Sequence, residues 1–301
     1  GDPPPDAAAS GSYKDSKSAL QLLRMTQRLP HIITFCGDID GMLGGGVALG
    51  EVTEFCGVPG IGKTQMGIQL AVDVHLPSIF GGAEGEAVYI DTEGSFMPER
   101  AAEIAQAFTT HVHKMASFRN DETSTAAANL LSTDSILQSI HLYRIHDYVE
   151  QIAVIHSLAS FLDEHPNVKL VVIDSIAFHF RHNFEDFALR SRLLSSLAQR
   201  LTQIASERDV AVVLINQVTT KFGNGATHLA PALGDSWAHA CTSRVMLFWE
   251  GGSRYAKLYK SPSRKCATVP YNIVADGVRG IVRKRVRQGD QENQNQNPRG
   301  N

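Results

Sequence analysis

The segment GVPGIGKT at residues 57–64 constrains the fold of this chain more than any other segment. It matches the pattern G-x-x-x-x-G-K-[ST], whose glycines let successive backbone N–H groups wrap closely around a phosphate. An apolar, strand-like stretch over 51–57 precedes the loop, and a helical pattern over 63–75 follows it. That context favours a phosphate-binding loop over the alternative, a glycine turn that merely precedes a helix.

The loop residues have defined chemical roles in such a site. We expect Lys63 to neutralise charge on β- and γ-phosphates, and the hydroxyl of Thr64 to bind Mg²⁺. The other expected phosphate-binding positions are Gly57, Val58, Pro59, Gly60, Ile61 and Gly62.

Strand-like and helical patterns alternate around the loop, as in α/β proteins. The predicted apolar strands and the helices between them are, in chain order, 86–91, 98–108, 141–145, 147–164, 168–174, 184–209 and 210–216. After residue 234, short stretches alternate like antiparallel strands joined by tight turns. The sequence therefore predicts an α/β fold with a mostly parallel central sheet, flanking helices and antiparallel C-terminal strands.

The length and composition fit one large domain with tails, or two small domains. Apolar residues make up 43% and charged residues 20%, and the net charge of −3 excludes a globally basic nucleic-acid binder but not a local basic groove. We predict a core over 16–282 between a flexible leader at 1–15 and a basic, then polar, tail at 283–301. Residues 109–133 are polar without a lasting period and are predicted to be an insertion loop. No apolar stretch is long enough to span a membrane, so no membrane partner is expected.

Acidic and amide residues end the predicted strands where a phosphate loop needs partners. Asp174 ends the most apolar strand and is the candidate metal-side carboxylate. Glu93 is the candidate to orient or activate water, with a helix-capping or surface glutamate as the alternative, while Asp91 is expected to be structural. Asn216 and Gln217 end a third strand, where an amide can contact a γ-phosphate or, equally, form a turn.

These segments together resemble the RecA-like recombinase family. The resemblance depends on five segments: the lead-in to the phosphate loop at 33–65, YIDTEGSFMPER at 89–100, LVVIDSIA at 170–177, VVLINQV at 212–218 and IVADGVRG at 273–280. Over residues 20–282 the chain is most similar to the eukaryotic recombinase paralogues, and among these to the C branch. The resemblance implies a RecA-like P-loop NTPase core that binds ATP with Mg²⁺ at a subunit boundary.

The resemblance also assigns individual residues. Lys63, Glu93 and Gln217 match catalytic positions, the last as a γ-phosphate sensor, and Thr64 and Asp174 match the Mg²⁺ ligands. Gln65 extends the nucleotide-binding loop. Arg100 matches a residue that lies against adenine, with a solvated helix charge as the alternative.

Two segments would face single-stranded DNA in such a protein. The first follows Asp174 and includes Arg181 and His182, and the second runs from Thr219 to Pro231 with Lys221. Phosphate contacts from these side chains would make the affinity salt-dependent. The alternative is that HFRH at 179–182 is simply a polar loop, or a core aromatic residue beside surface histidines.

Several departures from the filament-forming recombinase point to heteromeric assembly. The sequence as given shows neither the helical domain that the resemblance leads us to expect upstream nor an F-x-x-A signal in a linker before the core. Lys260 stands where the recombinase has an aspartate in its cap over the neighbour's ATP. The expected partners are single-stranded DNA, other recombinase paralogues (B, D and X-ray-complementing types) and the main recombinase. The basic run at 283–287 fits a nuclear-import signal, with a solvated terminus or an extra DNA-binding patch as equal alternatives. On the first interpretation we expect a nuclear, and also cytoplasmic, protein.

Three functions remain open from the sequence. The first is a DNA-dependent ATPase of homologous recombination and double-strand-break repair. The second is a structural adaptor that binds ATP to stabilise partner interfaces. A hexameric helicase with the same core fits the segments TEGSFMPER and GDSWAHA poorly.

Overall fold

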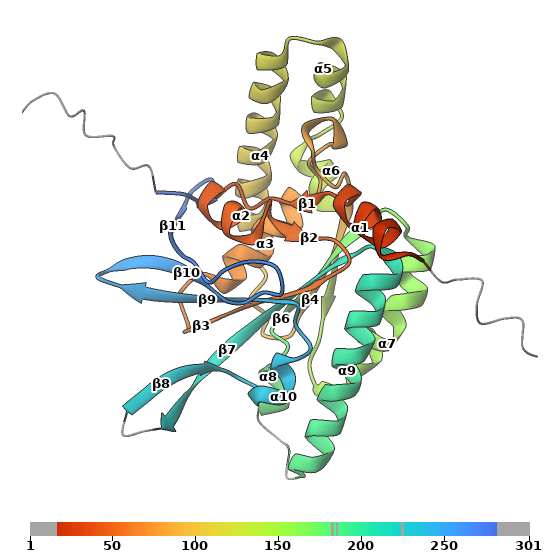
Figure 1. The fold of residues 1–301 in the computed structure, drawn as a ribbon. Coiled ribbons are helices and arrows are strands. Elements are labelled where there is room, and N and C mark those ends of the chain that lie inside the picture. Colours follow the sequence, from red (N-terminus) through yellow and green to blue (C-terminus); the bar gives the residue numbers. More distant parts are fainter. Residues whose placement is uncertain (1–16, 182–183, 185, 224–225, 282–301) are drawn as a thin grey trace, which may run out of the picture.

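The computed structural model of the chain describes residues 17–181, 184, 186–223 and 226–281 (Figure 1). The predicted leader at 1–15, the tail at 283–301 with its basic run, and His182 lie outside the described residues. Within the described part, one large sheet has the strand order β12-β11-β10-β9-β3-β7-β6-β4-β5, and β8 pairs with β7. Its strands are β3 (Val52–Gly57), β4 (Glu86–Asp91), β5 (Ile140–Arg144), β6 (Val168–Asp174), β7 (Ala211–Gly223), β8 (Ala226–Pro231), β9 (Ser243–Glu250), β10 (Ser253–Lys260), β11 (Thr268–Val274) and β12 (Gly277–Arg279).

The predicted fold class is confirmed by this sheet. Strands β9, β3, β7, β6, β4 and β5 run parallel, whereas β10, β11 and β12 add antiparallel to the β9 edge. The central parallel strands are apolar because helices cover both of their faces. A small second sheet pairs β1 (His31–Ile32) with β2 (Val47–Ala48).

Successive side chains along the central parallel strands point alternately into two separate hydrophobic cores. On β6, Val172 packs into one core and Ile173 into the other, as the period of two in a strand requires. The first core lies under α2 (Gly37–Leu43), α3 (Lys63–Asp73), α4 (Pro98–Arg119), α5 (Glu122–Asn129) and α6 (Thr133–Gln138). The second lies under α7 (Tyr148–Glu164), α9 (Phe187–Arg208) and α10 (Gly234–Ala238).

The prediction of an insertion loop at 109–133 is wrong. Helix α4 continues to Arg119, and α5 folds back beside it, so that the two project from the rest of the chain (Figure 1). Phe108, Val112 and Ala116 form a buried stripe every four residues along α4, the spacing of one helix face. The polar residues between them hide this stripe in the sequence.

The segment after Gln217, which we expect from the resemblance to be a loop, is instead regular structure. Strand β7 runs on to Gly223 and pairs with β8 from Val218↔Pro231 to Gly223↔Ala226. The second segment expected to face DNA is therefore a hairpin arm that continues a core strand, as Figure 1 shows.

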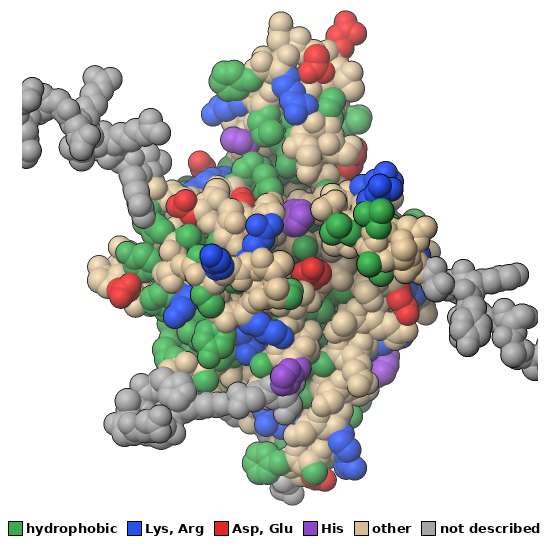
Figure 2. Space-filling view, viewed as in Figure 1, with side chains coloured by type: hydrophobic (Ala, Val, Ile, Leu, Met, Phe, Trp, Pro, Cys, Tyr) green, Lys and Arg blue, Asp and Glu red, His purple; other side chains and the backbone are tan. Residues whose placement is uncertain are grey.

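Three short elements complete the chain. Helix α1 (Ala19–Arg28) begins at a Ser18–Gln21 capping box and buries no residue. Hydrophobic side chains gather over it in Figure 2, and Leu20, Leu22, Leu23 and Met25 are about half exposed. The others are η1 (Ser78–Phe80) and α8 (Phe178–Arg181). Among the helices described here, none is both long and apolar enough to cross a lipid bilayer.

Candidate functional site

The register of the parallel strands brings the predicted site residues to one edge of the sheet. Asp91 pairs with Asp174, Asp174 with Ile215, and Gly57 with Gln217. The carboxyl ends of parallel strands form the usual ligand-binding edge of such sheets. The candidate site therefore lies where β3, β4, β6 and the paired part of β7 end.

The phosphate loop connects β3 directly to α3. Gly62, with φ +108°, is the residue before the helix, and Gly60 has φ +77°, a region that favours glycine. A Cβ on Gly57 would lie 2.5 Å from the carbonyl oxygen of Leu247. The first N–H groups of α3 have no partner within the helix and point out of its N-terminus. The loop is thus built as an anion cradle.

Lys63 begins α3 and folds back over the loop. Its Nζ donates a hydrogen bond of 2.9 Å to the carbonyl oxygen of Val58. Burial lowers the pKa of Lys63, and the carboxylates of Asp174 and Glu93 oppose that shift. The lysine is therefore a partly desolvated cation at the mouth of the cradle.

Asp174 accepts hydrogen bonds from three hydroxyl groups, on α3, on β4 and in the turn after β4. Its Oδ2 accepts from Thr64 Oγ1 at 2.7 Å, from Tyr89 Oη at 2.8 Å and from Ser95 Oγ at 3.4 Å. Burial raises the pKa of Asp174, and the hydrogen bonds from Thr64 and Tyr89 oppose the rise. The two residues predicted to bind metal, Thr64 and Asp174, are in direct contact.

Glu93 and Gln217 form the opposite side of the site. Oε1 of Glu93 accepts from Ser175 Oγ at 2.6 Å and from Gln217 Nε2 at 3.0 Å. Arg181, from the end of α8, in turn donates to Oε1 of Gln217. A chain of polar contacts thus runs from Ser175 through the glutamate and the amide to an exposed guanidinium.

Neighbouring residues on these strands have structural roles. Asp91 is buried and accepts backbone hydrogen bonds from Glu93, Ser95 and Phe96 at 3.0–3.3 Å, so it shapes the turn that presents Glu93. Asn216 points to the other face of the sheet, where its Nδ2 lies 2.7 Å from Glu54 Oε1. Of the two candidate amides, only Gln217 faces the phosphate loop.

One cavity lies between the phosphate loop and the side chains of Asp174, Glu93 and Gln217. It has a volume of about 360 Å³ and is lined by Pro59, Gly60, Gly62, Lys63, Thr64, Gln65, Glu93, Asp174 and Gln217. A triphosphate end with its cation fits a polar pocket of this kind, since the cradle, the lysine and the carboxylates converge on it. No three His, Cys, Asp or Glu side chains cluster as a metal site anywhere in the described ranges.

Arg100 lies beside this cavity rather than in it. Its Nε donates to Gln65 Oε1 at 2.7 Å, and its terminal nitrogens donate to the carbonyl oxygens of Val274 and Ala275, each at 2.6 Å. The side chain therefore joins the start of α3 to the β11–β12 turn. The alternative of a freely solvated helix charge is wrong.

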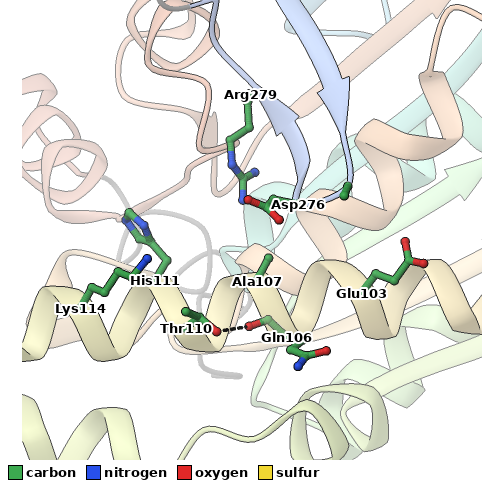
Figure 3. A pocket seen from close by; sticks show the side chains of 9 residues that line it. Glu103, Gln106, Ala107, Thr110, His111, Lys114, Asp276 and Arg279 are labelled. Atoms are coloured by element: carbon green, nitrogen blue, oxygen red, sulfur yellow. Dashed lines mark hydrogen bonds between the residues drawn. The ribbon is translucent and has the colours of Figure 1, made fainter.

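A second cavity, of about 510 Å³, lies on the other side of Arg100, between α4 and the β11–β12 turn. In Figure 3, His111 and Lys114 on α4 lie opposite Asp276 and Arg279. The lining of this second cavity combines acidic and basic side chains and includes none of the predicted site residues.

The remaining predicted residues lie away from the cavity or are not described. Lys260 donates to the carbonyl oxygens of Ala238 at 2.8 Å and Cys241 at 2.6 Å, behind α10. The backbone of Lys221 lies on the β7–β8 arm, but its side chain is not among the described ones. The lysine and arginine side chains in Figure 2 are scattered over several elements.

Two further site residues, Tyr89 and Ser175, are not predicted from the sequence. Tyr89 is buried two residues before Asp91, so strand alternation places it on the same face of the sheet as that residue. Its pKa lies well above the usual value because of burial and the nearby Asp174. Ser175 directly follows Asp174, and only the turn after β6 brings it to Glu93.

The strand–loop–helix cradle, the carboxylate that ends β6 and the glutamate that follows β4 define a P-loop NTPase core of the RecA type. More narrowly, the chain belongs to the Rad51 family, because the family model described as Rad51 matches residues 25–281. Members of this family are RecA-like ATPases. The resemblance predicted from the sequence is confirmed.

Two relatives show which branch of the family the chain resembles. It is 47% identical to DNA repair protein RAD51 homolog 3 of Cricetulus griseus over 278 residues, which cover 92% of this chain and 76% of the relative. It is 46% identical to the protein of the same name from Dictyostelium discoideum, over 83% of this chain and 66% of the relative. Homolog 3 is the C paralogue, and both relatives are described as DNA repair proteins.

Proposed function

We propose that the chain binds ATP with Mg²⁺ at residues 57–65 and hydrolyses it in response to single-stranded DNA. It would do so as one subunit of a heteromeric recombinase-paralogue complex in homologous recombination and double-strand-break repair. The observation that carries this proposal is the convergence of two polar pairs on one cavity. Thr64 contacts Asp174 on one side, and Glu93 contacts Gln217 on the other.

Each side chain has a role that follows from its position. Lys63 would leave the Val58 carbonyl and donate to β- and γ-phosphate oxygens. The hydroxyl of Thr64 and the carboxylate of Asp174 are oxygen donors that suit Mg²⁺, which usually takes one or two protein ligands besides phosphates and water. When bound, Mg²⁺ would supply charge neutralisation at the phosphates. Glu93 would accept a proton from water, while Ser175 and Gln217 hold its carboxylate in place.

The DNA role is supported by the path from the site to the surface. Arg181 contacts Gln217 directly, and the β7–β8 arm begins at the same amide. Arg181, His182 and Lys221 are proposed as phosphate contacts. Arg100 remains our candidate for contact with adenine, and Lys260 our candidate for capping a neighbour's nucleotide. That cap would require the ammonium to leave the carbonyl groups that now hold it.

The proposed partners are the B, D and X-ray-complementing paralogues and the main recombinase, in the nucleus and also the cytoplasm. The names of the two relatives place them in DNA repair, which supports this setting. Mass measurement of the chain mixed with each partner, with and without ATP, tests the assembly.

Replacement of Glu93 tests the hydrolytic mechanism. Glu93→Gln should leave ATP affinity within about twofold and slow turnover by about 10²-fold or more, because a positioned base is removed. Exposed Glu99→Gln is the matched control, and should change neither value. If the parent protein and Glu93→Gln hydrolyse ATP at the same rate, the better account is a structural adaptor that binds ATP to stabilise partner interfaces.

Replacement of Lys63 tests the cradle itself. Lys63→Ala should weaken ATP binding by about 1.5–3 kcal/mol, because a charge-assisted hydrogen bond is removed. Direct calorimetric titration of the variant against the parent measures this difference. Equal affinities would remove the phosphate-loop assignment.

A further inference from the structure

A second polar cluster lies behind the phosphate loop, on the other face of β3. Glu54, three residues before Gly57, is fully buried. Its Oε1 accepts from Asn216 Nδ2 at 2.7 Å and from Trp237 Nε1 at 3.2 Å, and its Oε2 accepts from Arg244 Nε. All three donors are themselves at most 4% exposed. We call these four residues the Glu54 cluster.

The cluster joins four elements, β3, β7, α10 and β9, of which β3 and β7 border the candidate site. Glu54 belongs to the strand that leads into the phosphate loop, and Asn216 precedes the amide that contacts Glu93. Asn216 also donates to the carbonyl oxygen of Ala232 at 3.0 Å, where the β7–β8 arm returns. The N–H of Ala232 donates to the carbonyl oxygen of Gln217 at 2.8 Å. One buried carboxylate therefore links the phosphate loop, the Gln217 strand end and the foot of the arm.

Stability does not account for such a cluster. A buried ion pair recovers little more than the cost of desolvating its two charges, and apolar residues of the same size often stabilise a core equally well. Buried polar networks favour the arrangement of the surrounding elements in which most of their polar groups have partners. In the Glu54 cluster all the hydrogen bonds to the carboxylate are made, while Oδ1 of Asn216 and Nη2 of Arg244 lack partners among the described residues. Here the favoured arrangement is that of Gln217 and the arm relative to the loop.

We propose that Glu54 is a positioning residue that couples the phosphate end of the site to the β7–β8 arm through Asn216 and Trp237. A change in the position of Gln217 on nucleotide binding would shift Asn216, and thereby the hydrogen bonds that tie Trp237 and the end of the arm to the same carboxylate. This inference rests on the proposed function, because it requires a nucleotide at the loop.

Tryptophan fluorescence provides a direct test. The chain has two tryptophans, buried Trp237 and the 46%-exposed Trp249, so the variant Trp249→Phe leaves Trp237 as the single reporter. In that background a non-hydrolysable ATP analogue with Mg²⁺ should change the Trp237 emission. Adding Glu54→Gln should abolish the response while the analogue's affinity stays within about threefold. In steady state, kcat should fall about tenfold with KM unchanged within threefold, the pattern expected when an interaction made only in the transition state is removed.

Two further variants separate positioning from folding. Asp73→Asn replaces another buried carboxylate, which Gln69 contacts on α3, and should leave emission response and turnover as in the parent. The pair Glu54→Gln with Arg244→Met removes the unpaired cation that the single change leaves, and should recover thermal stability without recovering the Trp237 response. Recovery of both by the pair would overturn the proposal, because the role would then be structural only.

The remaining outcomes are also decisive. Analogue binding with no change in Trp237 emission in the Trp249→Phe protein would contradict the coupling but not the proposed function. Absence of analogue binding would overturn the proposed function, and this inference with it.

If Glu54→Gln does not fold, Trp237→Phe removes one hydrogen bond and spares the ion pair. Nucleotide-dependent protection of residues 218–231 from hydrogen exchange should then be reduced, and unchanged protection would contradict the proposal.

Discussion

Among single residues, the carboxylates of Asp174, Glu54 and Asp40 differ in burial and in partners: the first two are buried, whereas Asp40 is half-buried. Asp174 and Glu54 receive several side-chain donors each and lie on strands that border the phosphate loop. Asp40 instead receives both of its bonds from Thr34, whose backbone N–H and hydroxyl each donate to Oδ1 at 2.8 Å. Of these three residues, only Asp174 and Glu54 are placed to affect a bound phosphate.

Asp40 should make stability depend on pH. Burial raises the pKa of Asp40 to about 6, and the Thr34 hydrogen bonds only partly oppose it. The pKa of Asp40 is higher in the folded protein than in the unfolded chain. The carboxyl therefore contributes to the free energy of unfolding at low pH, and this stabilisation is lost as pH rises through about 6. Asp40→Asn keeps the acceptor Oδ1, so its stability relative to the parent should increase by about 2–3 kcal/mol between pH 4 and pH 7. Urea unfolding across this range measures the difference, and a pH-independent difference would contradict it.

How far the sequence predicts these residues depends on whether their partners are local. Lys63 and Thr64 follow from one uninterrupted motif, and Asp174 follows from its place at a strand end. Ser175 and Tyr89 cannot be found in this way, since their hydrogen bonds cross between strands 80 or more positions apart in the chain. The Glu54 cluster is hidden for the same reason, although Glu54 lies three residues before the motif.

Among the elements, prediction succeeds where an apolar run has sharp ends and fails where it is interrupted. Strands β4 and β6 have the predicted bounds because their apolar runs end at charged residues. The sequence predicts that the helix beginning at 98 ends at 108, yet α4 extends eleven residues further because three apolar side chains suffice to pack it against α5 and α6. Sequence patterns underestimate a helix that is supported along such a narrow stripe.

A proline in the second half of α4 tests whether residues 109–133 are helical. Thr110 is exposed and interior to the helix, so Thr110→Pro should cost about 3 kcal/mol or more, because a backbone hydrogen bond is removed and the ring clashes with the preceding turn. Thr110→Ala, with a better helix propensity, should be neutral or slightly stabilising. Denaturant midpoints and far-UV circular dichroism compare the two. In an irregular loop the proline would be tolerated.

For the whole molecule, the proposed DNA surface spans separate elements that meet only in the fold. Arg181→Ala together with Lys221→Ala should lower single-strand affinity and reduce the slope of log affinity against log salt by about 0.7 for each phosphate that is no longer neutralised. Because Arg181 also contacts Gln217, the single change Arg181→Ala should reduce DNA stimulation of turnover more than Lys221→Ala does. Fluorescence anisotropy at several salt concentrations provides the slopes. An unaltered slope in the double variant would place the DNA site elsewhere.

Strand β7 has a further consequence for how such a molecule responds to load. Its 13 residues start in the middle of the sheet and end in the arm without a break, which at about 3.3 Å per residue is a rod of roughly 40 Å. The inner half of the strand lies between β3 and β6, whereas beyond Gln217 it pairs with β8. Force applied to the outer end of the arm is therefore expected to bend the strand at the point where the neighbouring strands of the central sheet no longer flank it. In this chain that point is Gln217.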